Sequence, residues 1–370
     1  METGKQTHEI YEALSFDKFG RLVFSSSSVS TKEATEGMKA TLQKDNNGAP
    51  DGTIKDVCNS FNRQLTLTIL PTEKCDFKCV YCFEKFELGM IKPSVIEGVK
   101  NLISNRINDL SDLNVMWYGG EPLLAYNQVV EVMRHINALK PSSLRIYSEM
   151  TTNGYNLTID KFTTLVNVGV RTYQISFDGE QEEHNKLRLR RDEKPSFDTI
   201  LGNLIAAHRT NLDFTIKVRL HINNINEQSV MRLLRRFKSE IDDDDRFEFN
   251  VRGLMKLGGE NDATLPVISK DSKSVSNVVE FAKSLGFKIT PRDPTYICYA
   301  SKPNSYMIRP NGSIIKCGVH IYRSENRIGV LNPDGTLALD TQNTLRWSRG
   351  MFSGDRVELS CPALNFPNGK

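Results

Sequence analysis

From Leu65 onward, the sequence alternates short apolar runs with amphipathic segments of roughly ten to fifteen residues. The apolar runs are rich in β-branched and aromatic residues and predict strands, whereas the segments between them have the spacing of helices. A chain that repeats strand and helix in this way builds a parallel sheet. Six such units indicate an α/β fold, a partial (β/α)6 barrel like an incomplete TIM barrel. The predicted strands are 65–70, 114–119, 144–152, 172–178, 214–222 and 247–253, and two clear helices are 93–107 and 126–139.

The most distinctive segments of the chain follow these predicted strands. A cysteine-rich loop comes after the first strand, GGEP (119–122) after the second, TNG (152–154) after the third and SFDG (176–179) at the end of the fourth. In barrels of this kind the chemistry lies at the carboxyl ends of the strands. We therefore expect these four segments to meet in one site.

Three cysteines, Cys75, Cys79 and Cys82, lie in the loop after the first strand. Thiolates are natural ligands of iron–sulfur clusters, and three of them leave the fourth iron of a four-iron cluster open for another ligand. Structural zinc normally has four protein ligands, and no fourth Cys or His lies within thirty residues after Cys82. A disulfide is disfavoured because a large chain without an apolar signal sequence indicates a reducing compartment.

The segment CDFKCVYCFEK (75–85), with Tyr81 before the last cysteine, resembles the signature of the radical S-adenosylmethionine (SAM) enzymes. Three further segments fit this family in order: YGGEPLL (118–124), TTNGYNL (151–157) and ISFDGEQEEHNKLR (175–188). The resemblance covers about residues 65 to 361. It implies a [4Fe–4S] cluster on the three cysteines that binds SAM at its open iron, so that one-electron reduction yields a 5′-deoxyadenosyl radical.

The resemblance also implies roles for individual residues. Glycines of GGEP let the backbone approach a ligand, and Glu121 would lie beside the ammonium group of SAM. Arg188 and Arg219 are candidates to pair with the SAM carboxylate, a task that one of them suffices for. Arg219 is favoured by its position on the fifth strand, and the alternative for Arg188 is an ordinary surface arginine. The residues expected to bind SAM are Tyr81, Gly119, Gly120, Glu121, Asn153, Ser176, Arg188 and Arg219.

Asp178 in SFDG resembles a position at which related enzymes keep an acidic residue near the substrate. We expect it either to accept a proton after hydrogen abstraction or to cap a turn. His184 is expected to be structural, and His221 has no visible partner and is given no role. The basic run 186–194 is a candidate for binding an anionic substrate or SAM, and the alternative is that its outer arginines belong to a solvated loop.

Past Phe287 the pattern changes to short strands and turns, which predicts a separate extension over residues 288–370. Cys298, Gly312 and Cys317 resemble the opening of the SPASM pattern found in one branch of the family, or of its shortened form, twitch. PNG at 310–312 predicts a hairpin turn that brings Cys317 back toward Cys298.

The remainder of the SPASM pattern is incomplete, because only Cys361 matches it. We therefore do not expect two full auxiliary clusters on these residues. We expect Cys298, Cys317 and Cys361 to bind one auxiliary iron–sulfur cluster, with an open site or with Cys58, His320 or a substrate group as fourth ligand. The alternatives are that these cysteines are simply buried, and that Cys58 is a buried small hydrophobic residue.

Residues 1–62 form a small N-terminal segment before the barrel, with a predicted strand at 21–24, a helical stretch from about Thr31 and a loop at 46–52. This segment is a candidate for recognising a leader peptide or substrate by strand addition. No apolar run is long enough to span a bilayer, and METGKQTHEIYEAL lacks the apolar stretch of a signal peptide. We therefore expect a cytoplasmic protein that does not bind membranes.

The formal net charge of +3 comes from 48 basic and 45 acidic residues, which gives no electrostatic case for nucleic acid. The resemblance implies radical modification of a peptide or protein, namely maturation of a ribosomally made precursor by a cross-link or an oxidation, with a reductant of the flavodoxin or ferredoxin type. The alternatives are oxidation of a Cys or Ser in a partner protein, as in sulfatase maturases, and a radical enzyme acting on a small molecule or RNA. A metal-bearing binding module without enzymatic activity is the remaining alternative.

Overall fold

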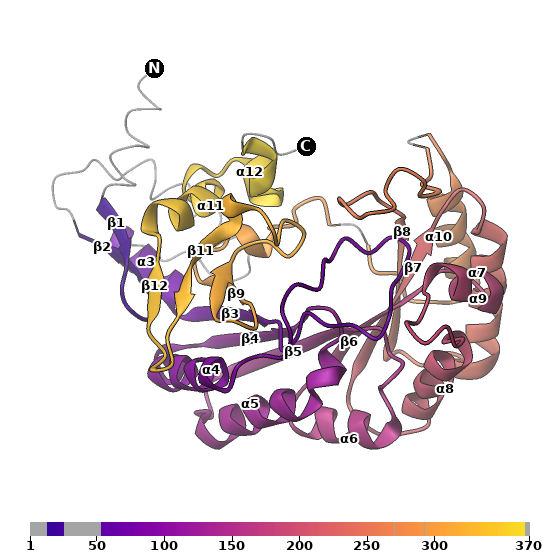
Figure 1. The fold of residues 1–370 in the computed structure, drawn as a ribbon, viewed down its shortest axis with the longest axis horizontal. Coiled ribbons are helices and arrows are strands. Elements are labelled where there is room, and N and C mark those ends of the chain that lie inside the picture. Colours follow the sequence, from indigo (N-terminus) through magenta and orange to yellow (C-terminus); the bar gives the residue numbers. More distant parts are fainter. Residues whose placement is uncertain (1–12, 26–52, 270, 292, 367–370) are drawn as a thin grey trace.

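The computed structural model describes residues 13–25, 53–269, 271–291 and 293–366 (Figure 1). Its N-terminal part contains a hairpin of β1 (Leu14–Phe16) and β2 (Leu22–Phe24), followed by α3 (Ile54–Asn62). The strand predicted at 21–24 is thus confirmed as β2. The predicted helical stretch from Thr31 and the loop at 46–52 lie outside the described residues.

All six predicted barrel strands are present, with each end within two residues of its predicted position. They are neighbours in chain order and run parallel to one another. The strands are β3 (Gln64–Ile69), β4 (Asp112–Trp117), β5 (Arg145–Thr152), β6 (Thr172–Phe177), β7 (Thr215–Ile222) and β8 (Phe247–Gly253).

Helices cover the outer face of this curved sheet (Figure 1). They are α4 (Pro93–Arg106), α5 (Tyr126–Leu139), α6 (Ile159–Asn167), α7 (Gln181–Leu187), α8 (Phe197–His208), α9 (Glu227–Ile241) and α10 (Ser274–Ser284), with short 3-10 turns η1 (Ile107–Asp109) and η2 (Pro122–Ala125). The predicted helices 93–107 and 126–139 are confirmed as α4 and α5.

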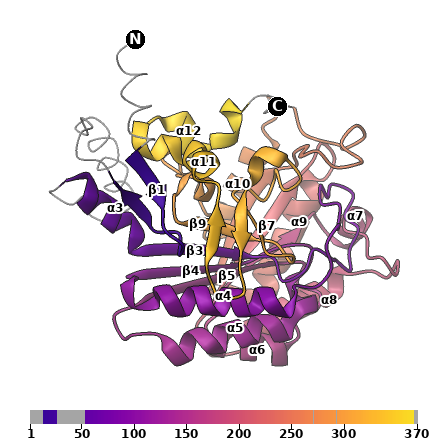
Figure 2. The same ribbon diagram turned by 60° about the vertical axis from the view of Figure 1, so that its left-hand side comes forward.

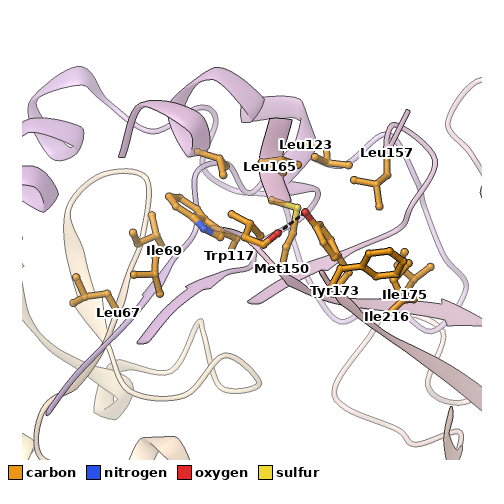
Figure 3. Close-up of a cluster of buried hydrophobic side chains, with 14 of the residues drawn as sticks. Leu67, Ile69, Trp117, Leu123, Met150, Leu157, Leu165, Tyr173, Ile175 and Ile216 are labelled. Carbon is orange, nitrogen blue, oxygen red and sulfur yellow. Dashed lines mark hydrogen bonds between the residues drawn. The ribbon is translucent and has the colours of Figure 1, made fainter. Parts of the chain in front are cut away.

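Strand residues alternate between the two faces of the sheet, as period two requires. Leu67, Trp117 and Ile175 point to the helices and are fully or almost fully buried (Figure 3). In the same cluster, the Tyr173 hydroxyl is buried and donates a hydrogen bond to the Val170 carbonyl at 2.7 Å. The opposite, concave face of the sheet carries half-buried polar side chains, so a functional site can form on that face.

The extension continues the barrel sheet. Its strand β9 (Ser305–Ile308) pairs in parallel with β3, and β10 to β12 follow as antiparallel strands at the outer edge (Figure 2). The predicted hairpin turn at 310–312 is confirmed, since Arg309 donates its backbone N–H to Ser313 at 2.9 Å. The remaining elements are β10 (Ser313–Ile315), β11 (Arg327–Leu331), β12 (Leu337–Leu339), α11 (Thr341–Ser353), α12 (Arg356–Ser360), η3 (Tyr299–Ser301), η4 (Ser324–Asn326) and η5 (Pro362–Asn365).

A second hydrophobic cluster joins the two ends of the described chain. Leu14 and Leu22 of the hairpin pack with Cys58 of α3 and with Leu345 and Met351 of α11. Cys58 is thus a buried apolar residue, in agreement with the simpler of its two predicted roles. Among the described helices, none is long and apolar enough to cross a membrane.

Candidate active site

The three cysteines of the predicted cluster line one cavity of about 220 Å³. The cavity lies at the carboxyl ends of the barrel strands, where the sequence motifs were expected to meet. All but one of the residues predicted to bind SAM also line it; these are Tyr81, Gly119, Gly120, Asn153, Ser176, Arg188 and Arg219. Glu121 is the exception.

The cysteine loop is held by the segment that follows α7. Backbone N–H groups of Lys78 and Val80 donate to the carbonyls of Leu189 and Leu187, both at 2.8 Å, and the Arg191 side chain donates to the Cys75 carbonyl at 2.8 Å. Within the basic run 186–194, Arg188 is buried whereas Arg191 is exposed. These hydrogen bonds hold the cysteine loop against residues 187–191.

Gly119 and Gly120 are required by the cysteine loop itself. Gly119 has φ of +120°, and a Cβ there would lie 2.3 Å from the Thr72 carbonyl oxygen. A Cβ on Gly120 would lie 2.4 Å from the Lys74 oxygen and 2.5 Å from the Glu73 oxygen. The glycines were predicted to admit a ligand; in the structure they also let two strand-end loops touch through their backbones.

Glu121 is not among the residues that line the cavity, and its place beside the SAM ammonium group stays a prediction. Its carboxylate is fully buried and accepts hydrogen bonds from the backbone N–H groups of Leu123 (2.9 Å) and Asn153 (2.7 Å) and from the Thr152 hydroxyl (2.7 Å). Burial raises the pKa of Glu121 to about 7, and these hydrogen bonds oppose that shift. The side chain therefore ties GGEP to TNG.

Asp76 ties the cysteine loop to the TNG segment in a similar way. Its two carboxylate oxygens accept from the side-chain amides of Asn153 (2.8 Å) and Asn156 (2.9 Å). The residue lies beside a cluster cysteine, and its partners follow seventy-seven and eighty residues later. No sequence pattern indicated this link between the cysteine loop and TNG.

Asp178 is fully buried and is not among the residues that line the cavity. One of its carboxylate oxygens accepts from the Tyr81 hydroxyl at 2.8 Å, and the other pairs with His221 Nδ1 at 2.9 Å. Burial raises the pKa of Asp178, but His221 and Arg188 outweigh that effect and hold the pKa below its usual value. Its predicted role as proton acceptor is untested, whereas these contacts favour a positioning role.

His221, for which no partner was predicted, pairs with Asp178 in the structure. The imidazole pairs with Asp178, lies edge-on to the Tyr81 ring at 5.2 Å between centroids, and lines the cavity. His184, by contrast, is fully buried against Phe177 and Phe197, as expected for a structural residue. Strict alternation along TIKVRLHI places Arg219 and His221 on one face, and that signal could have linked them.

Two arginines of the cavity keep buried donors without partners among the described residues. The Nε atoms of Arg188 and Arg219 are both buried and unpaired. Ser176 lies opposite Arg219 in the strand register and lines the same cavity. Buried guanidinium donors of this kind suit an anionic group such as a carboxylate.

Glu84 also lines this cavity, and sequence reasoning missed it. One of its carboxylate oxygens is buried without a partner among the described residues. Burial raises the pKa of Glu84 to about 7, and the nearby Glu73 adds to the shift. It follows Cys82 by two residues, but nothing in that spacing distinguishes it from a surface glutamate.

The three cysteines of the extension lie near one another. Burial raises the pKa of Cys298 to about 11, and the neighbouring Cys317 and Cys361 act in the same direction. The Cys298 N–H donates to the Leu359 carbonyl at 2.8 Å, and the Asn326 side chain accepts from the Cys317 N–H at 2.8 Å. Both trios consist of free thiols.

The cavity fits the cluster that the cysteine motif implies. Within the described ranges, no three His, Cys, Asp or Glu side chains are arranged around a point where one metal ion could sit. Cysteines that ligate a four-iron cluster bind different irons, so they must surround a larger space. Cys75, Cys79 and Cys82 line such a space, beside unpaired arginine donors.

A buried ion pair fastens the extension to the cysteine loop. Arg309 donates from Nε to Glu73 Oε1 at 2.7 Å and from Nη2 to Oε2 at 3.1 Å, and Glu73 is fully buried. Arg309→Leu would leave this carboxylate buried without its counter-charge, which costs about 3 kcal/mol. We expect urea unfolding to report that loss of stability.

The control for this variant is Arg171→Leu, which removes an ion pair with Asp213 whose side chains are 60% and 84% exposed. It should leave the unfolding midpoint almost unchanged, because exposed pairs contribute little. Equal midpoints for Arg309→Leu and Arg171→Leu would show that Arg309 does not secure the loop.

Comparison with known proteins supports this interpretation of the site. The model of the radical SAM superfamily matches residues 69–237. The chain is 25% identical over 193 residues to the cysteine-type anaerobic sulfatase-maturating enzyme of Clostridium novyi, covering 48% of this chain and 49% of that enzyme. It is 25% identical over 128 residues to the PqqA peptide cyclase of Bradyrhizobium diazoefficiens, covering 35% of this chain and 32% of the cyclase.

A GTP 3′,8-cyclase of Campylobacter jejuni subsp. doylei is 24% identical over 285 residues, which cover 70% of this chain and 82% of that enzyme. This match is longer than the other two. The chain spans about half of the sulfatase-maturating enzyme and about a third of the peptide cyclase.

Among solved structures, anSMEcpe with bound AdoMet and Cp18Cys peptide superposes with a TM-score of 0.59 and 18% identity, covering 76% of this chain and 80% of that one. SuiB of Streptococcus suis bound to the precursor peptide SuiA superposes with a TM-score of 0.56 and 16% identity, covering 95% and 78%. At this level of identity the similarity concerns the fold.

Proposed function

Because this chain belongs to the radical SAM superfamily, we propose that it modifies a peptide or protein by radical chemistry that begins with reductive cleavage of SAM. One observation carries the proposal. Three free cysteines and seven residues of the family motifs line the same cavity at the strand ends. When bound there, a reduced four-iron cluster would supply the electron that splits a carbon–sulfur bond of SAM.

The residues of the cavity have distinct tasks in this proposal. Cys75, Cys79 and Cys82 would hold the cluster. The unpaired donors of Arg188 and Arg219 would bind the SAM carboxylate, because guanidinium groups pair with carboxylates through two hydrogen bonds. The remaining residues shape the backbone around the ligand and keep water out.

The proposed substrate is a peptide segment. A second cavity of about 540 Å³ lies on the concave face of the sheet, lined by strand residues such as Glu149 and by Tyr296 of the extension. It shares Tyr118 and Thr151 with the first cavity, so a bulky substrate could lie beside SAM. The named substrates of the sulfatase-maturating and PqqA-cyclising relatives, and the peptides bound to anSMEcpe and SuiB, favour this class.

GTP is the second candidate substrate, because the GTP 3′,8-cyclases match the larger share of both chains. RNA is not favoured, since the charge of the chain is nearly balanced. The finer peptide proposal is maturation of a ribosomally made precursor by a cross-link or an oxidation, with sulfatase-type oxidation of a Cys or Ser as its rival.

Three further elements complete the proposal. Cys298, Cys317 and Cys361 would bind one auxiliary iron–sulfur cluster, and a flavodoxin- or ferredoxin-type protein would supply electrons. The N-terminal segment would contribute to peptide recognition, for which the β1–β2 hairpin offers a strand edge.

The test is anaerobic incubation of the reconstituted full chain with SAM, a reductant and one substrate at a time. Suitable substrates are a sulfatase-derived peptide with Cys, the same peptide with Ser, short precursor peptides encoded beside this chain, and GTP. We expect mass spectrometry to show that a peptide has lost hydrogen. The same peptide should be the source of the hydrogen that 5′-deoxyadenosine gains. Conversion of GTP with no peptide modified would overturn the peptide proposal and favour the nucleotide.

A further inference from the structure

A continuous chain of hydrogen bonds runs from Arg188 to His221 beside the cysteine loop. Arg188 Nη1 donates to the Tyr81 hydroxyl at 3.0 Å, and that hydroxyl donates to Asp178 Oδ2 at 2.8 Å. His221 Nδ1 pairs with Asp178 Oδ1 at 2.9 Å. Each member except Asp178 lines the cavity, so the chain begins and ends at its wall.

The side chain of Asn226 fixes the backbones of Asp178 and His221 relative to each other. The side-chain amide of Asn226 donates to the carbonyl of Asp178 and to the carbonyl of His221, both at 2.8 Å. Asn226 itself is fully buried. The ends of β6 and β7 are therefore clamped, and the imidazole cannot turn without breaking its bond to Asp178.

This arrangement determines which imidazole nitrogen faces the ligand. Asp178 is ionised at neutral pH because its pKa lies below its usual value, so both of its oxygens act as acceptors. With Nδ1 of His221 directed at Asp178, the tautomer that donates this hydrogen bond leaves Nε2 without a proton, so Nε2 can accept a hydrogen bond. Within the described part of the chain, Nε2 has no hydrogen-bond partner, although the His221 side chain is only 16% exposed.

We infer that His221 is a SAM-contacting residue whose Nε2 accepts a hydrogen bond from a hydroxyl or amino group of SAM, and that Asp178 is the positioning residue that sets its tautomer. SAM offers such donors in its ribose hydroxyls, its adenine amino group and its ammonium group. The inference rests on the proposed binding of SAM and does not depend on the proposed peptide substrate.

The test compares SAM affinity of cluster-loaded variants by equilibrium dialysis under anaerobic conditions without reductant. His221→Phe keeps a ring against Tyr81 but has no acceptor, and we expect SAM to bind about tenfold more weakly, the equivalent of about 1.4 kcal/mol. His221→Gln keeps an acceptor and should stay within about threefold of the wild-type affinity. Asp178→Asn, which leaves the imidazole without a charged partner, should fall between them.

His208→Phe is the matched control, because His208 Nδ1 pairs with Asp244 at 2.8 Å in the same way but does not line the cavity. It should bind SAM with the wild-type affinity. Iron and sulfide content and thermal unfolding are measured for every variant, so that loss of the cluster or of the fold is separated from loss of the contact.

Wild-type affinity in His221→Phe at full cluster content would overturn the inference, and so would binding in His221→Gln that is as weak as in His221→Phe. Absence of SAM binding by the wild-type protein would instead overturn the proposed function. The two failures are therefore distinguishable.

Discussion

Cys79→Ala is expected to prevent assembly of the four-iron cluster and to lower SAM cleavage at least about a thousandfold, which corresponds to ~4 kcal/mol of activation free energy. Cys79 lies between the other two cysteines in sequence and lines the same cavity. Without its thiolate, only two ligands remain on the loop, too few to hold a cluster whose fourth iron is open. Iron and acid-labile sulfide counts after anaerobic reconstitution provide the measurement.

Cys58→Ala is the matched control for this substitution. Cys58 is also a free and buried cysteine, but it packs in the cluster of Leu14, Leu22 and Met351. Its replacement should cost about 1 kcal/mol of stability and leave the metal content unchanged. The assignment of Cys79 as a ligand would be wrong if its alanine variant kept the iron and sulfide content of Cys58→Ala.

Gly120→Ala is expected to displace the cysteine loop, with loss of the cluster and a destabilisation of about 3 kcal/mol. The added Cβ would lie 2.4 Å from the Lys74 oxygen and 2.5 Å from the Glu73 oxygen, and both are backbone atoms. Neither can swing aside like the end of a side chain. The Glu121 N–H also donates to the Lys74 oxygen at 2.9 Å, so relief of the clash would break this bond just ahead of Cys75.

Gly202→Ala gives the comparison for a glycine without such contacts. Gly202 lies in α8, and a Cβ there would have nothing within 4 Å. Alanine should stabilise the helix by about 0.5–1 kcal/mol and leave cluster content unchanged. If Gly120→Ala instead matched the wild type in denaturant unfolding and in iron content, the close approach of the two loops would not be essential.

Much of the barrel could be predicted because its strands and helices have different periods. Strands such as TIKVRLHI alternate strictly, and α5 begins and ends where its amphipathic pattern does. The cavity-lining positions of the cysteines, GGEP and TNG follow from one rule, that loops at the carboxyl ends of parallel strands meet. Local sequence was enough for these features.

The contacts that close the site are remote in sequence, and no local pattern indicates them. His221 and Asp178 are 43 residues apart, and Arg309 and Glu73 are 236 apart. The direction of the Glu121 carboxylate depends on three donors, two of which belong to the next strand end. Whether the extension pairs with β3 also depends on which edge of the sheet is free, which is a property of the folded barrel.

The most direct test of the account is formation of 5′-deoxyadenosine by the wild-type protein. The reconstituted full chain is incubated anaerobically with SAM and dithionite, and 5′-deoxyadenosine and methionine are quantified beside the Cys79→Ala variant. The account predicts both products in equal amounts from the wild-type protein and neither from the variant. A wild-type protein that carries its cluster and binds SAM, yet forms no more 5′-deoxyadenosine than Cys79→Ala, would contradict it.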